Sequence, residues 1–175
     1  IICFNFDDTR MGANMESFLK GYNDPRISAY FNKGSDGDYH GIRNGINITN
    51  KSDYSEGPFS TLNIASSTPI IWMHPAEVYF LRAEGALRGW NMGDNAQNLY
   101  EAGIRTSFSY WGVGGADNYI ANDSSLPAAY IDPVNNGNNM AASDSLLSKI
   151  TIKWNDADGF ETNLERIITQ KWRAM

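Results

Sequence analysis

Apolar residues recur at helical spacing between residues 75 and 111, in two runs separated by a short turn. Pro75 suits the first turn of a helix, the turn falls between Gly89 and Gly93, and Asp94 is predicted to cap the second helix. The apolar or small positions are Tyr79, Ala83, Ala86, Leu87 and Trp90, then Ala96, Leu99, Tyr100, Gly103, Ile104, Ser107, Phe108 and Trp111. The pattern predicts an antiparallel helical hairpin over about 75–111, in which small residues let the two axes approach closely.

A second helical pattern ends the chain, over about 160–175. Leu164, Ile167, Ile168 and Trp172 fall on one predicted apolar face. The pattern runs to Met175 without a Gly, Asn or Pro to close it. We therefore expect a longer parent chain, of which residues 1–175 form part of one domain.

The rest of the chain is rich in turn-forming residues. Gly, Pro, Asn and Asp interrupt residues 1–68, where the pattern favours only a short helix over 15–20 and allows a short strand over 46–49. Residues 112–158 are predicted to be loop, and a loop of that length often marks a binding segment.

The fold class that these patterns indicate is mainly α. Ala96, Tyr100 and Gly103 repeat the small–aromatic–small spacing found in the second helix of a tetratricopeptide unit. We expect tetratricopeptide-like helical hairpins with long irregular loops.

Composition narrows the classes of partner. Hydrophobic residues make up 42% and charged residues 19% of the chain, which excludes the usual signature of disorder. A net charge of −6 without a basic stripe argues against nucleic acid and anionic membrane surfaces as partners. The single cysteine, Cys3, permits no internal disulfide and is interpreted as a small buried or edge residue.

The sequence offers little for catalysis. Its two histidines, His40 and His74, lie in separate segments, and His74 is interpreted as the residue that opens the first helix of the hairpin. No glycine-rich phosphate loop is present. The acids of the hairpin, Glu77, Glu84 and Glu101, are expected on solvated helix faces or in ion pairs between helices, which disfavours a glycoside hydrolase.

One segment resembles a cation site in part. Asp156, Asp158, Gly159 and Glu165 occupy four positions of the calcium-loop template, but Trp154 falls where its first ligand belongs. We interpret the segment as an Asn- and Asp-rich turn before the last helix, and predict neither a metal nor a cofactor.

The loops carry the residue types that recognise sugars, namely aromatic rings together with Asn, Asp and Arg. They gather in two stretches of sequence, over 22–44 and 111–130. The candidate ligand-binding residues are Tyr39, Arg43, Asn44, Trp111, Asn118, Tyr119 and Tyr130. A structural reading stands beside this one, because Trp111 continues a helix stripe, Tyr130 can anchor its loop, and the segment 24–26 favours a turn held by an Asp–Arg contact.

Several separated motifs in the same order resemble the SusD/RagB-like family of Bacteroidetes outer-membrane lipoproteins. The strongest is Ala76-Glu77-Val78-Tyr79-Phe80-Leu81-Arg82-Ala83-Glu84 at the start of the hairpin. Others are Lys20-Gly21-Tyr22-Asn23-Asp24-Pro25-Arg26, Gly41-Ile42-Arg43-Asn44-Gly45, Leu99-Tyr100-Glu101-Ala102-Gly103-Ile104 and Glu165-Arg166-Ile167-Ile168-Thr169-Gln170-Lys171-Trp172. The match covers nearly all of this chain but only the C-terminal part of the family's length.

The resemblance implies a tetratricopeptide-like superhelix and a binding role without catalysis. It implies a surface-exposed protein of the cell outer membrane, held there only by a lipid anchor that this chain lacks. The implied partners are an oligosaccharide and a SusC-like TonB-dependent outer-membrane transporter. Two alternatives stay open: a peptide ligand, as in RagB-like members, and a tetratricopeptide-type scaffold for protein interactions.

Overall fold

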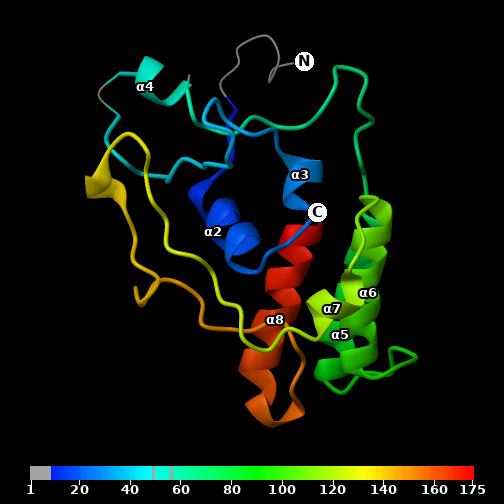
Figure 1. The fold of residues 1–175 in the computed structure, drawn as a ribbon. Helices are drawn as coiled ribbons and strands as arrows, with labels where there is room; N and C mark the ends of the chain where they lie inside the picture. Colours follow the sequence, from blue (N-terminus) through cyan, green and yellow to red (C-terminus); the bar gives the residue numbers. More distant parts are fainter. Residues whose placement is uncertain (1–8, 49, 56) are drawn as a thin grey trace. The chain divides into compact units, whose positions relative to one another are not determined.

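Helices are the regular elements of this protein (Figure 1). The computed structural model describes residues 9–48, 50–55 and 57–175. The α-helices are α2 (Ala13–Gly21), α3 (Ile27–Tyr30), α4 (Ser52–Ser55), α5 (Pro75–Leu87), α6 (Ala96–Tyr110), α7 (Ala116–Ile120) and α8 (Gly159–Ala174), with 3-10 helices η1 (Asn136–Asn138) and η2 (Asp156–Asp158). Across these described residues, β-structure is limited to isolated bridges, so the mainly α fold class is confirmed.

The chain divides into two compact units. Unit 1 comprises the residues up to Pro69 together with Leu126–Ser148, and unit 2 comprises Ile70–Ser125 together with Lys149–Met175. The expectation that the 175 residues form part of one domain stays a prediction.

The predicted hairpin is present in unit 2, where α5 and α6 lie side by side (Figure 1). His74 opens α5 as predicted, because its Nδ1 accepts a hydrogen bond from the Ala76 amide at 3.2 Å. The predicted cap of α6 is off by one residue. Asn95, not Asp94, has the extended backbone of an N-cap, and its Oδ1 accepts from the Asn98 amide at 2.8 Å.

The two helices of the hairpin meet at a residue without a side chain. A Cβ placed on Gly103 of α6 would lie 2.8 Å from ring carbons of Phe80 on α5. Phe80 is fully buried, and its ring meets that of Tyr100 at a centroid distance of 6.3 Å. The Tyr100 hydroxyl in turn donates to the Ile152 carbonyl oxygen at 2.7 Å, which ties the segment before α8 to the hairpin core.

Helix α8 runs antiparallel to α5, with Lys171 beside Glu77 and Phe160 beside Arg88. The face of α8 that is buried is not the apolar face predicted from the sequence. Ile167 is buried, but Ile168 is 46% and Trp172 is 40% exposed.

Polar side chains occupy the buried face of α8 instead: Asn163, Arg166, Gln170 and Arg173. Gln170 Nε2 and Arg173 Nη1 both donate to the Tyr119 hydroxyl oxygen, at 3.2 and 2.9 Å. Long polar side chains can be buried where partners satisfy them, and hydrophobic periodicity does not register this.

Part of the predicted loop 112–158 is helical. Helix α7 packs on α6 through Tyr119, whose ring centroid lies 5.0 Å from that of Phe108. A five-residue helix has little intrinsic stability, so packing rather than local sequence accounts for it. The turn predicted before α8 is confirmed: Asn155 Oδ1 accepts from the Ala157 amide at 3.1 Å.

Unit 1 is built around α2, which contains the predicted helix 15–20. Its core joins Met11, Leu19 and Phe31, with partly buried apolar side chains around them. Residues 46–48 form no strand, and Thr49, like Cys3, lies outside the described residues.

The turn predicted at 24–26 is confirmed. Arg26 donates to Asp24 through Nε at 2.9 Å and Nη2 at 2.5 Å, and both side chains are fully buried. Removing one partner of such a pair leaves an uncompensated charge in the interior.

No helix in the described part of the chain is long and apolar enough to cross a membrane.

We expect Gly103→Val to destabilise the hairpin by about 1–3 kcal/mol, because the new side chain displaces the Phe80 ring. Urea unfolding followed by circular dichroism measures the change. Ala102→Val on the same helix is the control and should cost less than about 0.7 kcal/mol, the loss in helix propensity. In a double variant, Phe80→Leu should relieve part of the Gly103→Val effect. Equal effects at 102 and 103 would show that the close approach does not limit the fold.

Candidate ligand-binding site

A buried carboxylate organises the loop 130–140 of unit 1. Asp132 precedes Pro133, and its Oδ1 accepts hydrogen bonds from the amides of Val134 at 2.8 Å and Asn135 at 3.1 Å. This is the local turn that an Asp side chain forms with the backbone two and three residues ahead. The loop is closed by the antiparallel bridge between Tyr130 and Met140.

The second carboxylate oxygen of Asp132 reaches a distant part of the sequence. Its Oδ2 accepts from the Tyr54 hydroxyl at 3.1 Å and from Asn138 Nδ2 at 2.7 Å. Asn138 Nδ2 also lies 3.1 Å from the Tyr54 hydroxyl oxygen, so the three side chains form a closed triangle. The loop is thereby fastened to α4, which carries Tyr54.

Burial and hydrogen bonding act on Asp132 in opposite directions. Burial raises the pKa of its carboxyl, but the donors Asn138, Val134, Asn135 and Tyr54 outweigh it, and the pKa lies below its ordinary value. The pKa of the Tyr54 hydroxyl is raised by burial and by the Asp132 charge. Asp132 is therefore held as an acceptor and Tyr54 as a donor.

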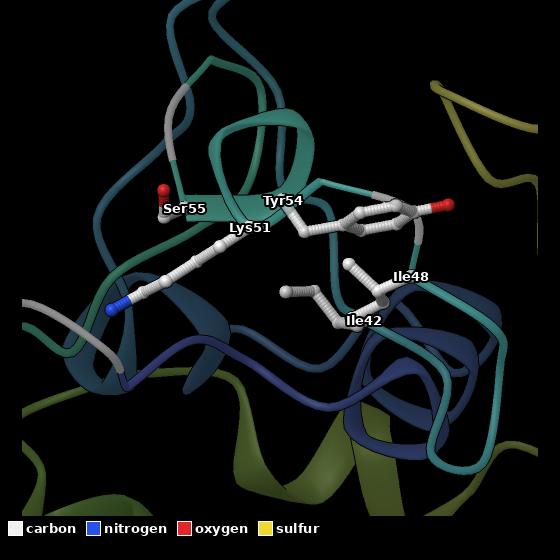
Figure 2. Close-up of a pocket in the computed structure, with 5 residues that line it drawn as sticks. All are labelled: Ile42, Ile48, Lys51, Tyr54 and Ser55. Carbon is white, nitrogen blue, oxygen red and sulfur yellow. The ribbon is translucent and has the colours of Figure 1, made fainter.

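A cavity of about 360 Å³ lies beside α4, lined by Ile42, Ile48, Lys51, Tyr54 and Ser55 (Figure 2). Figure 2 shows the Tyr54 ring next to the two isoleucines, whereas the side chains of Lys51 and Ser55 lie away from that ring. The Tyr54 ring also stacks on Phe59, with centroids 5.1 Å apart. The cavity thus joins an apolar, aromatic wall to a wall with a hydroxyl and an ammonium group.

The structure brings two predicted residues to the loop beside this cavity. Arg43 Nη1 donates to the Asn138 carbonyl oxygen at 3.1 Å. The buried Tyr130 donates to the Gly41 carbonyl oxygen at 3.0 Å, and burial, followed by the charges of Asp132 and Glu16, raises the pKa of its hydroxyl. Both side chains position the loop.

The other predicted residues of unit 1 flank this region in sequence. Tyr39 packs on the Met11–Leu19–Phe31 core, with Lys33 Nζ 5.6 Å from its ring centroid. Asn44 is exposed in a turn.

The three remaining candidates lie in unit 2. Trp111 ends α6 half-buried, and its Nε1 donates to the Ala174 carbonyl oxygen at 3.4 Å. Asn118 is exposed on α7, whereas Tyr119 is buried and accepts hydrogen bonds from α8. The stretch 111–130 is thus divided between the units, and ligand contact by any of the seven candidates stays a prediction.

Sequence reasoning missed the residues at the centre of the site, which are Tyr54, Asp132 and Asn138. The Asp132–Pro133 pair was a usable signal, because Asp before a turn commonly accepts from the following amides. No local pattern marked Tyr54, whose partners lie 78 and 84 positions away.

The family model for SusD-like proteins, described as "Susd and RagB outer membrane lipoprotein", matches residues 1–175. The chain belongs to the SusD-like family. The resemblance drawn from the motifs is confirmed, and the family is by description one of outer-membrane lipoproteins.

Solved SusD-like structures share both sequence and fold with this chain. A chitin-binding SusD homologue from Flavobacterium johnsoniae is 43% identical with a TM-score of 0.83, over 99% of this chain and 35% of that protein. A SusD-like protein from Bacteroides thetaiotaomicron is 42% identical with a TM-score of 0.89, over 99% and 36%. A homologue from Bacteroides uniformis is 41% identical with a TM-score of 0.87, over the same shares. The SusD-like chain therefore spans about a third of the length of these relatives.

Comparison with curated proteins gives no match.

Asp132→Ala should destabilise unit 1 by about 2–4 kcal/mol, because the amides of the loop and the Tyr54 hydroxyl lose their acceptor. Hydrogen exchange of the Val134 and Asn135 amides should accelerate in step with the loss measured by urea unfolding. Asp53→Asn, an exposed neighbour of Tyr54, is the matched control and should change stability by less than about 0.5 kcal/mol. Unchanged exchange in Asp132→Ala would refute the role of the carboxylate.

The lowered pKa of Asp132 predicts a pH dependence. A carboxyl whose pKa is lower folded than unfolded stabilises the fold above its unfolded pKa of about 3.9, and this stabilisation is lost as pH falls through the folded value. The stability difference between the native protein and Asp132→Asn should therefore be full near pH 7 and shrink below about pH 4. Urea unfolding at a series of pH values measures it, and a difference that stays constant down to pH 2 contradicts the assignment.

Proposed function

We propose that this SusD-like protein captures oligosaccharides at the outer face of the outer membrane and delivers them to a TonB-dependent transporter. The observation that carries the proposal is the 43% identity, over 99% of the chain, with a protein described as a chitin-binding SusD homologue. Because the chain spans about a third of that relative, the ligand, the lipid anchor and the transporter of the whole protein all belong to the proposal.

The chemistry of the unit 1 cavity supports a sugar ligand. A pyranose ring has apolar C–H faces and a rim of hydroxyl groups, so it suits a site with an aromatic or aliphatic wall and a few polar groups. Tyr54 and Ile48 supply the aromatic and aliphatic wall, and Ser55 and Lys51 supply the polar groups. The Tyr54 ring is already held by Phe59 and Asp132, which lowers the entropy lost on binding.

The proposal is binding without turnover. Glycoside hydrolysis uses two carboxylic groups across the scissile bond. Among the described residues that line the cavity, none carries a carboxylate. The nearby Asp132 has both oxygens committed to protein donors.

Titration calorimetry with chito-oligosaccharides should show binding, while an assay for reducing ends shows no increase. Lys51→Met and Ser55→Ala should each raise the Kd by roughly tenfold, the effect of one lost hydrogen bond in a site. Lys33→Met removes an exposed ammonium elsewhere in unit 1 and should leave the Kd unchanged.

Release of reducing ends would overturn the binding-only function. If calorimetry shows binding heat with peptides and none with oligosaccharides, the ligand is a peptide, as in RagB-like proteins. Chemical cross-linking in outer-membrane preparations tests the delivery step, which requires a TonB-dependent transporter among the products.

A further inference from the structure

Unit 2 contains a second cavity, of about 320 Å³, with a polar lining. Its lining comes from the end of the segment that follows α7, from residues 151–158, and from α8. The polar side chains are those of Asp123, Thr151, Lys153, Asn155, Asp158 and Arg166. Its volume equals that of about ten water molecules in the liquid, and lies within the range of small-molecule sites.

The floor of this polar cavity is a buried guanidinium group. Arg166 is 4% exposed and is held by the Thr151 carbonyl oxygen at 3.3 Å, by Asn163 Oδ1 at 2.6 Å, and by the carboxylate of Asp158. A further contact to Thr151 Oγ1 is 3.5 Å long. These four contacts use four of the five N–H groups of an Arg side chain, so within the described residues one N–H of Nη1 has no protein acceptor.

The rim of the polar cavity carries an accessible ion pair. Lys153 Nζ lies 3.4 Å from Asp123 Oδ2, and both side chains are more than half exposed. The Lys153 amide donates to the Asn122 carbonyl oxygen at 2.9 Å, which holds the two segments together at this point. This backbone hydrogen bond fixes where Asp123 and Lys153 lie, while the carboxylate and the ammonium group remain exposed to a ligand.

The charges that line the polar cavity cancel. Two carboxylates, Asp123 and Asp158, stand against two cations, Lys153 and Arg166. A free anion would meet the carboxylates and a free cation would meet the ammonium and guanidinium groups, so neither is favoured. A hydroxyl group both donates and accepts, and it can pair with a carboxylate and a cation at once.

We propose that the polar cavity is a second sugar site, which binds one neutral monosaccharide unit through its hydroxyl groups. The inference rests on the proposed function, and assigns unit 2 a subsite separate from the cavity of unit 1. Asp123 and Lys153 engage hydroxyls at the rim, and the spare N–H of Arg166 donates to a hydroxyl at the floor.

A tryptophan in the lining provides a specific reporter. Trp154 lines the polar cavity, and its indole N–H donates to Asp156 Oδ1 at 2.7 Å. A ligand in the cavity should therefore shift the indole N–H resonance of Trp154 in a two-dimensional NMR spectrum. Trp154→Phe assigns that resonance by its disappearance.

The experiment is a titration of the protein with N-acetylglucosamine and with glucose, followed at the Trp154 indole. A saturable shift is expected, and Asp123→Asn and Lys153→Met should each raise the fitted Kd by roughly tenfold. Asp117→Asn is the matched control, because it breaks an exposed ion pair with Arg105 in the same unit, and it should keep the native Kd.

The outcomes separate this site from that of unit 1. Lys51→Met should weaken oligosaccharide binding without altering the Trp154 response. Asp123→Asn should weaken the Trp154 response without altering oligosaccharide binding at unit 1. If oligosaccharides bind and the Trp154 indole resonance does not shift, the second site is refuted while the proposed function stands. The same conclusion follows if Asp123→Asn and Lys153→Met both keep the native Trp154 response. If the indole responds and calorimetry shows no oligosaccharide binding at unit 1, the second site stands and the cavity of unit 1 is rejected.

Discussion

Hydrogen bonding of buried charged groups is the constraint on which both units depend. Long segments of this chain have neither a helix nor a strand ladder, so their backbone amides and carbonyl groups need side-chain partners. In unit 1 Asp132 accepts from two backbone amides, and in unit 2 Arg166 donates to the Thr151 carbonyl oxygen and to Asn163. A buried charge without such partners would be expelled to water, and its loop would follow. The hydrogen bonds that keep these charged side chains buried therefore also fix the conformation of the loops.

This constraint also fixes part of the wall of each cavity. Side chains that hydrogen-bond to Asp132 or Arg166 also line the neighbouring space, namely Tyr54 in unit 1 and Thr151 and Asp158 in unit 2. Tyr54 is an example, because its hydroxyl is committed to Asp132 while its ring forms the wall of the unit 1 cavity. A wall held in place in this way is ready for a ligand before the ligand arrives. The proposed sugar ligand would meet a wall of this kind in the unit 1 cavity.

Sequence reasoning located the neighbourhood of the candidate site better than its centre. The residue types of the loops predict Arg43 and Tyr130, and both residues take part in the contacts of the loop 130–140. They do not predict Tyr54, whose contacts with Asp132 and Asn138 join positions 78 and 84 residues apart. Composition and spacing report the kinds of residue in a loop, but no periodicity encodes which distant residue lies opposite.

The hairpin, the cap at His74, the turn at Asp24–Arg26 and the family follow from the sequence alone, because each depends on residues close together or on motifs in a set order. The buried face of α8 depends on the tertiary structure. Its apolar pattern points to Ile168 and Trp172, yet Arg166, Gln170 and Arg173 turn inward because Tyr119, Thr151 and Asp158 are there to receive them. Hydrophobic pattern is a property of the helix, whereas the satisfaction of a buried polar group is a property of its neighbours, and only the folded chain supplies those.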